Sequence, residues 1–170
     1  MTGALVAGVL ILSAVGSLLW AVPSKSDRRR ADMRTHAMQS GLSVTTLTIP
    51  DTSTRGRIER RQRLVTAYKK RAPGASRAAL PELLVLRTEG EHGYGLPEGW
   101  VWRESDFRLR GHQLQQLLEA LDGLPNWVEC FAVLSDGIAM AIEEYEGVTR
   151  VNELASLLGA RADRLYEVIS

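Results

Sequence analysis

The hydrophobic residues of the chain follow two patterns that separate at Pro23. Before it, Gly3 to Val22 is a stretch of twenty residues without a charge. As a helix rising about 1.5 Å per residue, this stretch is about 30 Å long, the thickness of a bilayer's hydrocarbon core. After Pro23, shorter apolar runs show the periods of strands and amphipathic helices. The pattern predicts a transmembrane anchor over residues 1–23 and a folded domain after it.

The domain contains six segments with strand character. Leu42 to Ile49 is rich in β-branched residues, and Pro50 ends it. Asp136-Gly137 lies between two apolar runs and favours a two-residue hairpin turn. The six predicted strands are 42–49, 63–69, 82–88 and 100–103, together with the two arms of a hairpin within 127–145.

The hairpin is apolar on both of its faces. In the predicted register Val133 faces Met140 and Phe131 faces Ile142 on one side, while small apolar residues share the other. Such a hairpin should lie inside the sheet and be covered by helices.

The same register places two acidic residues, Glu129 and Glu144, opposite each other. Facing carboxylates repel, so this pair needs either solvent or a cation. A frayed strand end is expected here rather than acid–base chemistry.

Two helices are indicated by periodicity and by their end signals. Leu114, Leu117, Leu118 and Leu121 repeat at the spacing of one helix face, and Gly123 closes that helix. Residues 24–41 are expected to form a short basic helix, for which Ser26 is the expected N-cap and Gly41 the expected stop.

Together these elements predict an α+β fold. An N-terminal transmembrane helix is followed by a mostly antiparallel sheet of about five or six strands, covered by two or three helices. Residues 24–41 are the basic juxtamembrane helix, and residues 42–170 are the cytoplasmic α+β domain.

Charge is distributed unevenly although the chain has a net charge of only +1. Residues 1–80 contain 14 Lys and Arg against 4 Asp and Glu, whereas residues 81–170 contain 7 against 16. Positive charges follow the apolar stretch and are missing before it, so the positive-inside bias places the N-terminus outside and the domain in the cytoplasm. A retained anchor is therefore expected rather than a cleaved leader. A single pass through the membrane is expected.

The residues next to the apolar stretch suit a membrane interface. Tryptophan is favoured at the headgroup level, and arginines there meet anionic lipids, at about 1 kcal/mol per residue. The expected interface residues are Trp20, Lys25, Arg28, Arg29, Arg30 and Arg34.

A second basic run lies too far along the chain to be needed for topology. Three interpretations remain open: docking on the anionic inner leaflet, contact with an acidic partner, or a solvated edge strand protected by its charge. Its residues are Arg57, Arg60, Arg61, Arg63, Lys69, Lys70 and Arg71.

Small residues recur at intervals of four in the apolar stretch, at Ala4/Gly8 and Ser13/Ser17. This spacing lets two membrane helices approach closely, so a weak homodimer through the transmembrane helix is an alternative to a monomer.

The sequence carries no recognisable catalytic or cofactor motif. Walker-type GK[ST], GxGxxG, HExxH and nucleophile-elbow patterns are all missing, and the three histidines are scattered. Cys130, the single cysteine, lies in the apolar run "CFAVL" and is expected to be a core residue. We therefore expect no catalytic residue, no cofactor and no metal, and a protein that acts by binding.

The C-terminal segment resembles the helix-turn-helix of DNA-binding regulators. The resemblance rests on the spacing of Leu154, Ala155, Gly159 and Leu165. It implies that Gly159 makes the turn and that the following helix, with Arg161 and Arg164, enters the major groove. However, residues 149–170 carry three basic and three acidic residues, and phosphate would repel the acidic half of the chain. Nucleic acid is thus not the expected partner, and two amphipathic helices covering the sheet are the structural alternative.

Most of the chain resembles uncharacterised single-pass inner-membrane proteins of Gram-negative bacteria. The resemblance is carried by Pro23-Ser24 with the arginines behind it, by Leu96 to Trp100 ("LPEGW"), and by Leu124-Pro125 before the hairpin. The front end alone is similar to the preprotein-translocase accessory subunit YajC. It departs from that subunit because it lacks an Arg-Pro-Gln and continues well beyond the subunit's usual length.

These observations predict a non-enzymatic, membrane-anchored accessory or scaffold protein with a cytoplasmic interaction domain. Its expected partners are the anionic inner leaflet of the bilayer and an unidentified membrane or cytoplasmic protein. The alternative is a membrane-tethered DNA-binding regulator that uses the C-terminal helix-turn-helix-like segment.

Overall fold

The computed structural model describes residues 24–50, 62–72, 76–78, 80–90, 92–104, 109, 111–142 and 148–168. The predicted transmembrane anchor, with Trp20, lies outside these residues. None of the helices within them is both long and apolar enough to cross a bilayer.

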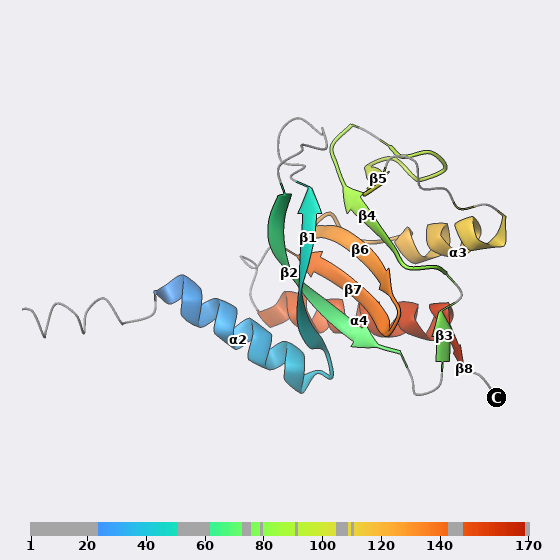
Figure 1. Cartoon of the computed structure of the whole chain (residues 1–170). Helices are drawn as coiled ribbons and strands as arrows, with labels where there is room; N and C mark the ends of the chain where they lie inside the picture. Colours follow the sequence, from blue (N-terminus) through green and yellow to red (C-terminus); the bar gives the residue numbers. More distant parts are fainter. Residues whose placement is uncertain are drawn as a thin grey trace, which may run out of the picture.

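The described residues form an α+β fold around one antiparallel sheet of six strands, in the order β1-β2-β7-β6-β4-β5 (Figure 1). All six predicted strands are therefore confirmed, and the β6–β7 hairpin lies at the centre, as its two apolar faces require. The strands are β1 (Ser43–Pro50), β2 (Gln62–Arg71), β4 (Leu83–Arg87), β5 (Trp100–Trp102), β6 (Val128–Leu134) and β7 (Gly137–Ile142).

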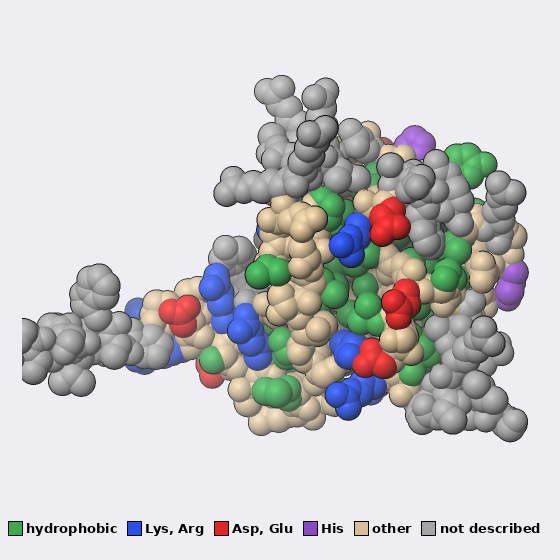
Figure 2. Space-filling view, viewed as in Figure 1, with side chains coloured by type: hydrophobic (Ala, Val, Ile, Leu, Met, Phe, Trp, Pro, Cys, Tyr) green, Lys and Arg blue, Asp and Glu red, His purple; other side chains and the backbone are tan. Residues whose placement is uncertain are grey.

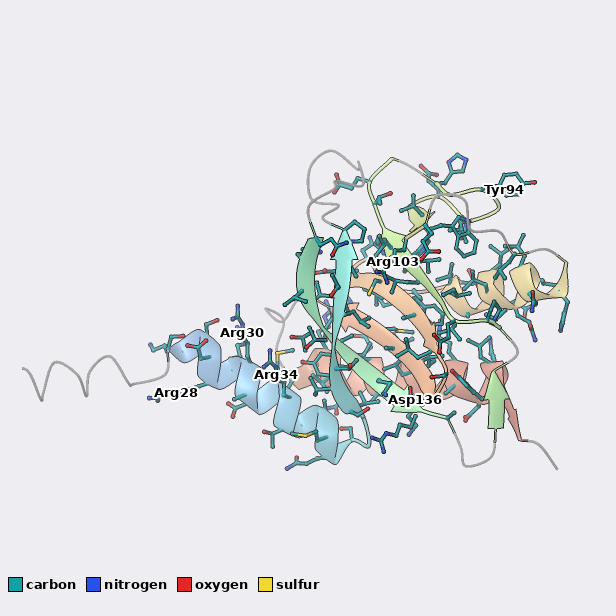
Figure 3. The ribbon with its side chains drawn as sticks, in the orientation of Figure 1. Arg28, Arg30, Arg34, Tyr94, Arg103 and Asp136 are labelled. Carbon is teal, nitrogen blue, oxygen red and sulfur yellow. The ribbon has the colours of Figure 1, made fainter. Side chains whose placement is uncertain are left out.

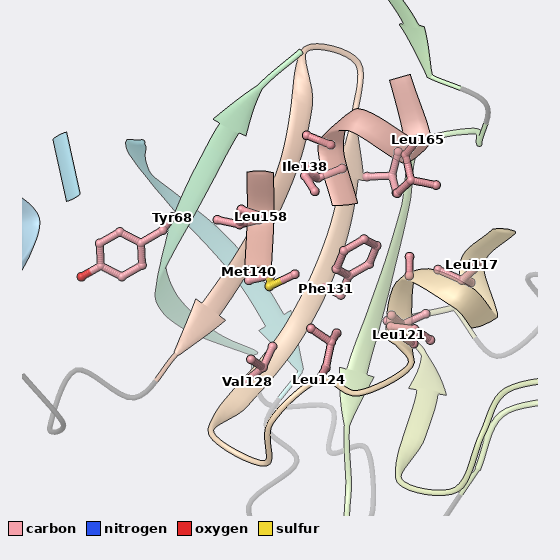
Figure 4. Packing of buried hydrophobic residues seen from close by; sticks show 14 of the residues in the cluster. Tyr68, Leu117, Leu121, Leu124, Val128, Phe131, Ile138, Met140, Leu158 and Leu165 are labelled. Carbon is pink, nitrogen blue, oxygen red and sulfur yellow. The ribbon is translucent and has the colours of Figure 1, made fainter. Parts of the chain in front are cut away.

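Three helices pack on one face of this sheet: α2 (Lys25–Gln39), α3 (His112–Leu121) and α4 (Val148–Leu165). Their buried residues join Phe131 and Met140 from the central strands in the larger hydrophobic cluster (Figure 4). Leu158 and Leu165 extend from α4 over the hairpin. Burial of this apolar face is the main force that holds the helices to the sheet.

The opposite face of the sheet has a second, smaller cluster, and no helix of the described residues contributes to it. The sequence predicted helices over both faces of the hairpin, which is wrong for this side. Instead the sheet curls, so that Ile49 on β1 joins the same cluster as Val101 on β5, although these are its two edge strands. The floor between them consists of small residues, mainly alanines and Cys130, which are nearly or completely buried. Small side chains let the two halves of the sheet approach each other.

The hairpin turn differs from its predicted position. Leu134 pairs with Gly137, so the two turn residues are Ser135 and Asp136 rather than Asp136-Gly137. Phe131 now faces Met140, a shift by an even number of positions that keeps every side chain on its predicted face.

Gly137 is required by the neighbouring strand rather than by the turn. A Cβ atom at this position would lie 2.2 Å from the carbonyl oxygen of Lys70 on β2, and its φ is +155°. The glycine thus permits the close approach of β7 to β2.

Glu144 lies outside the described residues, so its predicted position opposite Glu129 stays a prediction. A bulge separates the pairs Val128↔Ile142 and Cys130↔Ala141 and leaves Glu129 as the extra residue. Of the two expected alternatives, solvent or a cation, Glu129 has a cation, because Arg63 pairs with it across 2.6 Å.

The ends of α2 explain where this helix begins and stops. Ser24 rather than the predicted Ser26 is the N-cap, and it forms a capping box with Asp27. Hydrogen bonds from the Ser24 side chain and backbone lower the pKa of Asp27. At the other end Gly41 adopts a φ of +76°, as its role as the stop requires.

The C-terminal segment forms one continuous helix, α4, through Gly159. The predicted turn at Gly159 is wrong, and so is the alternative of two separate helices. Val151, Leu154, Leu158 and Ala162 form one buried stripe along the helix. This stripe packs into the larger cluster, against the sheet.

A small second sheet follows α4. Its strands are β3 (Ser76–Ala78) and β8 (Tyr166–Val168), which pair antiparallel and were not predicted. The hydroxyl of Tyr166 donates to the carbonyl oxygens of Leu134 and Gly137, at 2.5 and 2.8 Å. These hydrogen bonds hold the end of α4 against the hairpin turn.

Candidate functional site

The N-terminal half of α2 extends beyond the sheet (Figure 1). Lys25, Arg28 and Arg29 are exposed there, and Figure 3 shows Arg28 and Arg30 on the part of the helix that is farthest from the sheet. These cations lie on the turns that directly follow Pro23. We call residues Lys25, Arg28, Arg29, Arg30 and Arg34 the basic arm.

The second half of α2 is fixed to the domain. Met33 and Ala37 are completely buried in the larger cluster. The Arg34 guanidinium donates to Thr66 Oγ1 at 3.1 Å, and His36 Nε2 lies 2.7 Å from Asn152 Oδ1 on α4. Because one half is anchored by these contacts, the basic arm has a defined direction relative to the domain.

The described cations of the second basic run lie toward opposite ends of β2. Arg63 and Lys69 lie about 20 Å apart along β2, at a rise of about 3.3 Å per residue. Each makes an ion pair of 2.6 Å, Arg63 with Glu129 and Lys69 with Asp136. The hydrogen bond from Lys69 lowers the pKa of Asp136.

The edge-strand interpretation is wrong for Lys69, Lys70 and Arg71, because this half of β2 lies between β1 and β7 and pairs with β7 over Ala67–Arg71. Lys70 and Arg71 continue β2 beside the hairpin turn, and the Lys70 ammonium lies near Gly41 at the end of α2. A cation is favoured at the C-terminus of a helix. Arg57, Arg60 and Arg61 lie outside the described residues.

The curled face of the sheet holds a groove of about 410 Å³. One wall is formed by β1 around Leu47, and the other by the start of β4 around Leu84. Ala132 and Leu134 on β6 lie between these walls. Figure 2 shows apolar side chains in this hollow. The volume is within the usual range for ligand pockets, about 300 to 1,000 Å³.

Charged residues line only one side of the groove. Glu82, Arg103 and Glu104 are exposed there, and Figure 3 shows Arg103 in the space between β1 and β4. No hydrogen bond or ion pair within the described residues engages these three side chains. The β1 wall has no charged residue at all.

A second hollow, of about 510 Å³, lies beside α3 and is more open. Arg87 is at its base, where the guanidinium lies 4.5 Å from the centre of the Trp100 ring. The same guanidinium donates to the carbonyl oxygens of Leu124, Pro125 and Val128. This arginine supports the connection from α3 to β6.

Two kinds of candidate remain, the single cysteine and possible metal ligands. Cys130 is completely buried, and burial raises the pKa of its thiol to about 12, so the core interpretation is confirmed. Within the described ranges no three His, Cys, Asp or Glu side chains are arranged to hold a metal ion.

The arginines of the helix-turn-helix resemblance have different surroundings. Arg161 donates to the backbone carbonyls of Ala120 and Asp122, at 2.9 and 2.8 Å, and so secures the end of α3. Arg164 is exposed on the same continuous helix. The geometry that the DNA-binding alternative requires, a separate recognition helix after a turn, is not what α4 forms.

Sequence reasoning missed the groove entirely. Its charged side comes from Glu82 before β4 and from Arg103 and Glu104 after β5, segments that no local pattern links. The one available signal was the row of small residues on one face of the predicted hairpin, which is compatible with a curled sheet.

Comparisons of the chain with protein-family models, with curated proteins and with solved structures found no match. The site must therefore be interpreted from its own chemistry.

Proposed function

We propose that the chain is a single-pass inner-membrane accessory or scaffold protein that acts by binding rather than by catalysis. Residues 1–23 cross the membrane with the N-terminus outside, and the basic arm lies at the anionic cytoplasmic leaflet. The α+β domain is held close to that leaflet and offers its surface to a partner protein.

The observation that carries this proposal is the position of the basic arm. Lys25, Arg28 and Arg29 are exposed on the turns of α2 that follow the apolar stretch Gly3 to Val22, and these turns project from the sheet. An arginine near an anionic leaflet contributes about 1 kcal/mol. The anchored half of α2 transmits this attraction to the domain through Met33 and Ala37.

The division of charge supports the same arrangement. Residues 81–170 carry an excess of nine acidic residues, which an anionic leaflet repels. The attraction of the basic arm and the repulsion of the acidic part together orient the domain, with its acidic surface toward the cytoplasm.

The test measures contact between α2 and lipid in nanodiscs that hold the full-length chain. Ala31, an exposed residue of α2, is replaced by cysteine and labelled with an environment-sensitive fluorophore. Cys130 is buried with a raised pKa, so labelling is specific to position 31. We expect an emission shift on changing from neutral to anionic lipid, and we expect salt to reverse it.

Charge reversal identifies the residues responsible. Arg28→Glu with Arg29→Glu should abolish the lipid-dependent shift. Arg103→Glu with Arg164→Glu is the matched control, because it makes the same change in net charge at exposed positions away from α2. Equal emission in neutral and anionic nanodiscs, or equal effects of the two double variants, would contradict a specific role for the basic arm.

A further inference from the structure

The groove on the curled face lies between the two edges of the sheet. β1 is one edge strand and β5 the other, and the backbone after β5 continues the pairing with β4, because Arg103 N–H donates to Leu84 O at 3.1 Å. The walls of the groove thus belong to strands that are far apart in the sheet order but close in space. An added strand at this place would fill the gap between the two edges.

β1 has the properties of a strand that receives another strand. Within the described residues it pairs only with β2, over its full length of eight residues. Its other edge therefore presents backbone N–H and C=O groups, and Thr46, Leu47 and Thr48 line the groove. A long, uncharged edge strand is a ready template for an extended peptide, which gains affinity through main-chain hydrogen bonds.

The side chains that line the groove determine the chemistry of the peptide that fits it. Leu47, Leu84 and Leu134 supply an apolar surface for alternate side chains of an extended segment. On the charged side, Glu82 and Glu104 outnumber Arg103, and they belong to the half of the chain with the acidic excess. This arrangement favours cations in the incoming segment.

We propose that the groove binds an extended segment of a partner protein in which apolar and basic residues alternate. The segment pairs with the free edge of β1, places its apolar side chains in the groove and directs basic side chains toward Glu82 and Glu104. The inference rests on the proposed function, because it names the chemistry of the partner that a scaffold protein requires.

The test uses the full-length chain in nanodiscs of neutral lipid, which do not attract basic peptides. The probe is a fluorescein-labelled decapeptide of five Lys-Val repeats, and binding is measured by fluorescence anisotropy. Two peptides are controls: five Glu-Val repeats, and the Lys-Val peptide with N-methyl groups on the amides of one edge. We expect saturable binding of the unmodified Lys-Val peptide and at least tenfold weaker binding of both controls.

A pair of charge-reversal variants locates the site. The double variant Glu82→Lys with Glu104→Lys should weaken binding of the Lys-Val peptide about tenfold and should strengthen binding of the Glu-Val peptide. Glu98→Lys with Glu119→Lys makes the same change in net charge at exposed positions by the other hollow, and should change binding less than twofold. All four positions are exposed, so both variants should fold.

Three results would overturn the proposal: no saturable binding, equal binding of the N-methylated peptide, or equal loss in the two double variants. Dimerisation of the chain through β1 without peptide binding would assign the groove to a second copy and would overturn it as well. Peptide binding in neutral nanodiscs does not depend on contact between the basic arm and anionic lipid, so this inference and the proposed function can fail separately.

Discussion

Single residues in this fold are constrained by close contacts that the sequence shows only indirectly. Gly137 was predicted as part of the turn, whereas its actual constraint is the carbonyl oxygen of Lys70 on the next strand. Glu129 was expected to need either solvent or a cation, and Arg63 supplies the cation from 66 residues away in sequence. The residue types were thus informative, but the partners depend on long-range pairing.

Substitution of Gly137 tests the close approach of β7 to β2. We expect Gly137→Ala to lower the free energy of unfolding by about 2 to 3 kcal/mol, because the new Cβ atom forces the strands apart. Gly123→Ala is the control. That position also has a positive φ, +65°, but no atom within 4 Å of the added Cβ. Denaturant titration of the full-length chain in detergent should give a loss of only about 1 kcal/mol there; equal losses would contradict the steric explanation.

Tyr166 makes the stability of the fold sensitive to alkaline pH. Burial, with smaller contributions from Asp136 and Glu82, raises the pKa of its hydroxyl to about 12. The unfolded state releases this proton near pH 10, so the stabilisation is complete below pH 10 and is lost as pH rises toward 12.

We expect the melting temperature of the wild type to fall between pH 10 and pH 12 more steeply than that of Tyr166→Phe. The phenylalanine variant should also be less stable at pH 7, by about 1 to 2 kcal/mol, because two carbonyl oxygens lose their donor. Cys130 contributes in the same direction and is present in both proteins, so the difference between their slopes isolates Tyr166. Parallel curves would show that the hydroxyl is not held as described.

At the scale of elements, a strong hydrophobic period was sufficient to predict a helix or strand. Elements that depend on tertiary pairing were not predicted. The apolar repeat over 112–121 and the β-branched segment 42–49 gave elements close to their observed bounds. β3 and β8 were missed because three-residue strands carry no period and exist only through each other. The turn predicted at Gly159 failed because the stripe on either side packs on one continuous surface, and a glycine inside a helix is tolerated when packing outweighs propensity.

The two arginines of α4 provide a matched pair for the helix contact with α3. Arg161→Ala should cost about 2 kcal/mol of stability, because two backbone carbonyls at the end of α3 lose a charged donor. Arg164→Ala, at an exposed position, should change stability by less than about 0.5 kcal/mol. Urea unfolding monitored by circular dichroism separates the two. A larger effect at Arg164, or duplex-DNA binding lost only in these variants, would instead favour the regulator hypothesis.

At the scale of the whole molecule, the sequence predicted the class of fold and a main sheet of about five or six strands, but not the curvature of that sheet. Curvature depends on how alanines on β6 and β7 pack under β1 and β5, and the residues of this cluster are spread over all six strands. The groove follows from that curvature, so it could not be predicted either. The basic arm is the part of the proposed site that was predicted, because its cations are contiguous in the sequence.

The most direct test of the account is the location of the domain in a bacterial cell. Alkaline phosphatase, which is active only in the periplasm, and a green fluorescent protein, which matures in the cytoplasm, are fused separately after Ser170. The account predicts fluorescence in the membrane fraction and no phosphatase activity, because the positive charges after Pro23 retain the domain inside. Phosphatase activity without fluorescence, or fluorescence in the soluble fraction, would contradict the anchor and its orientation.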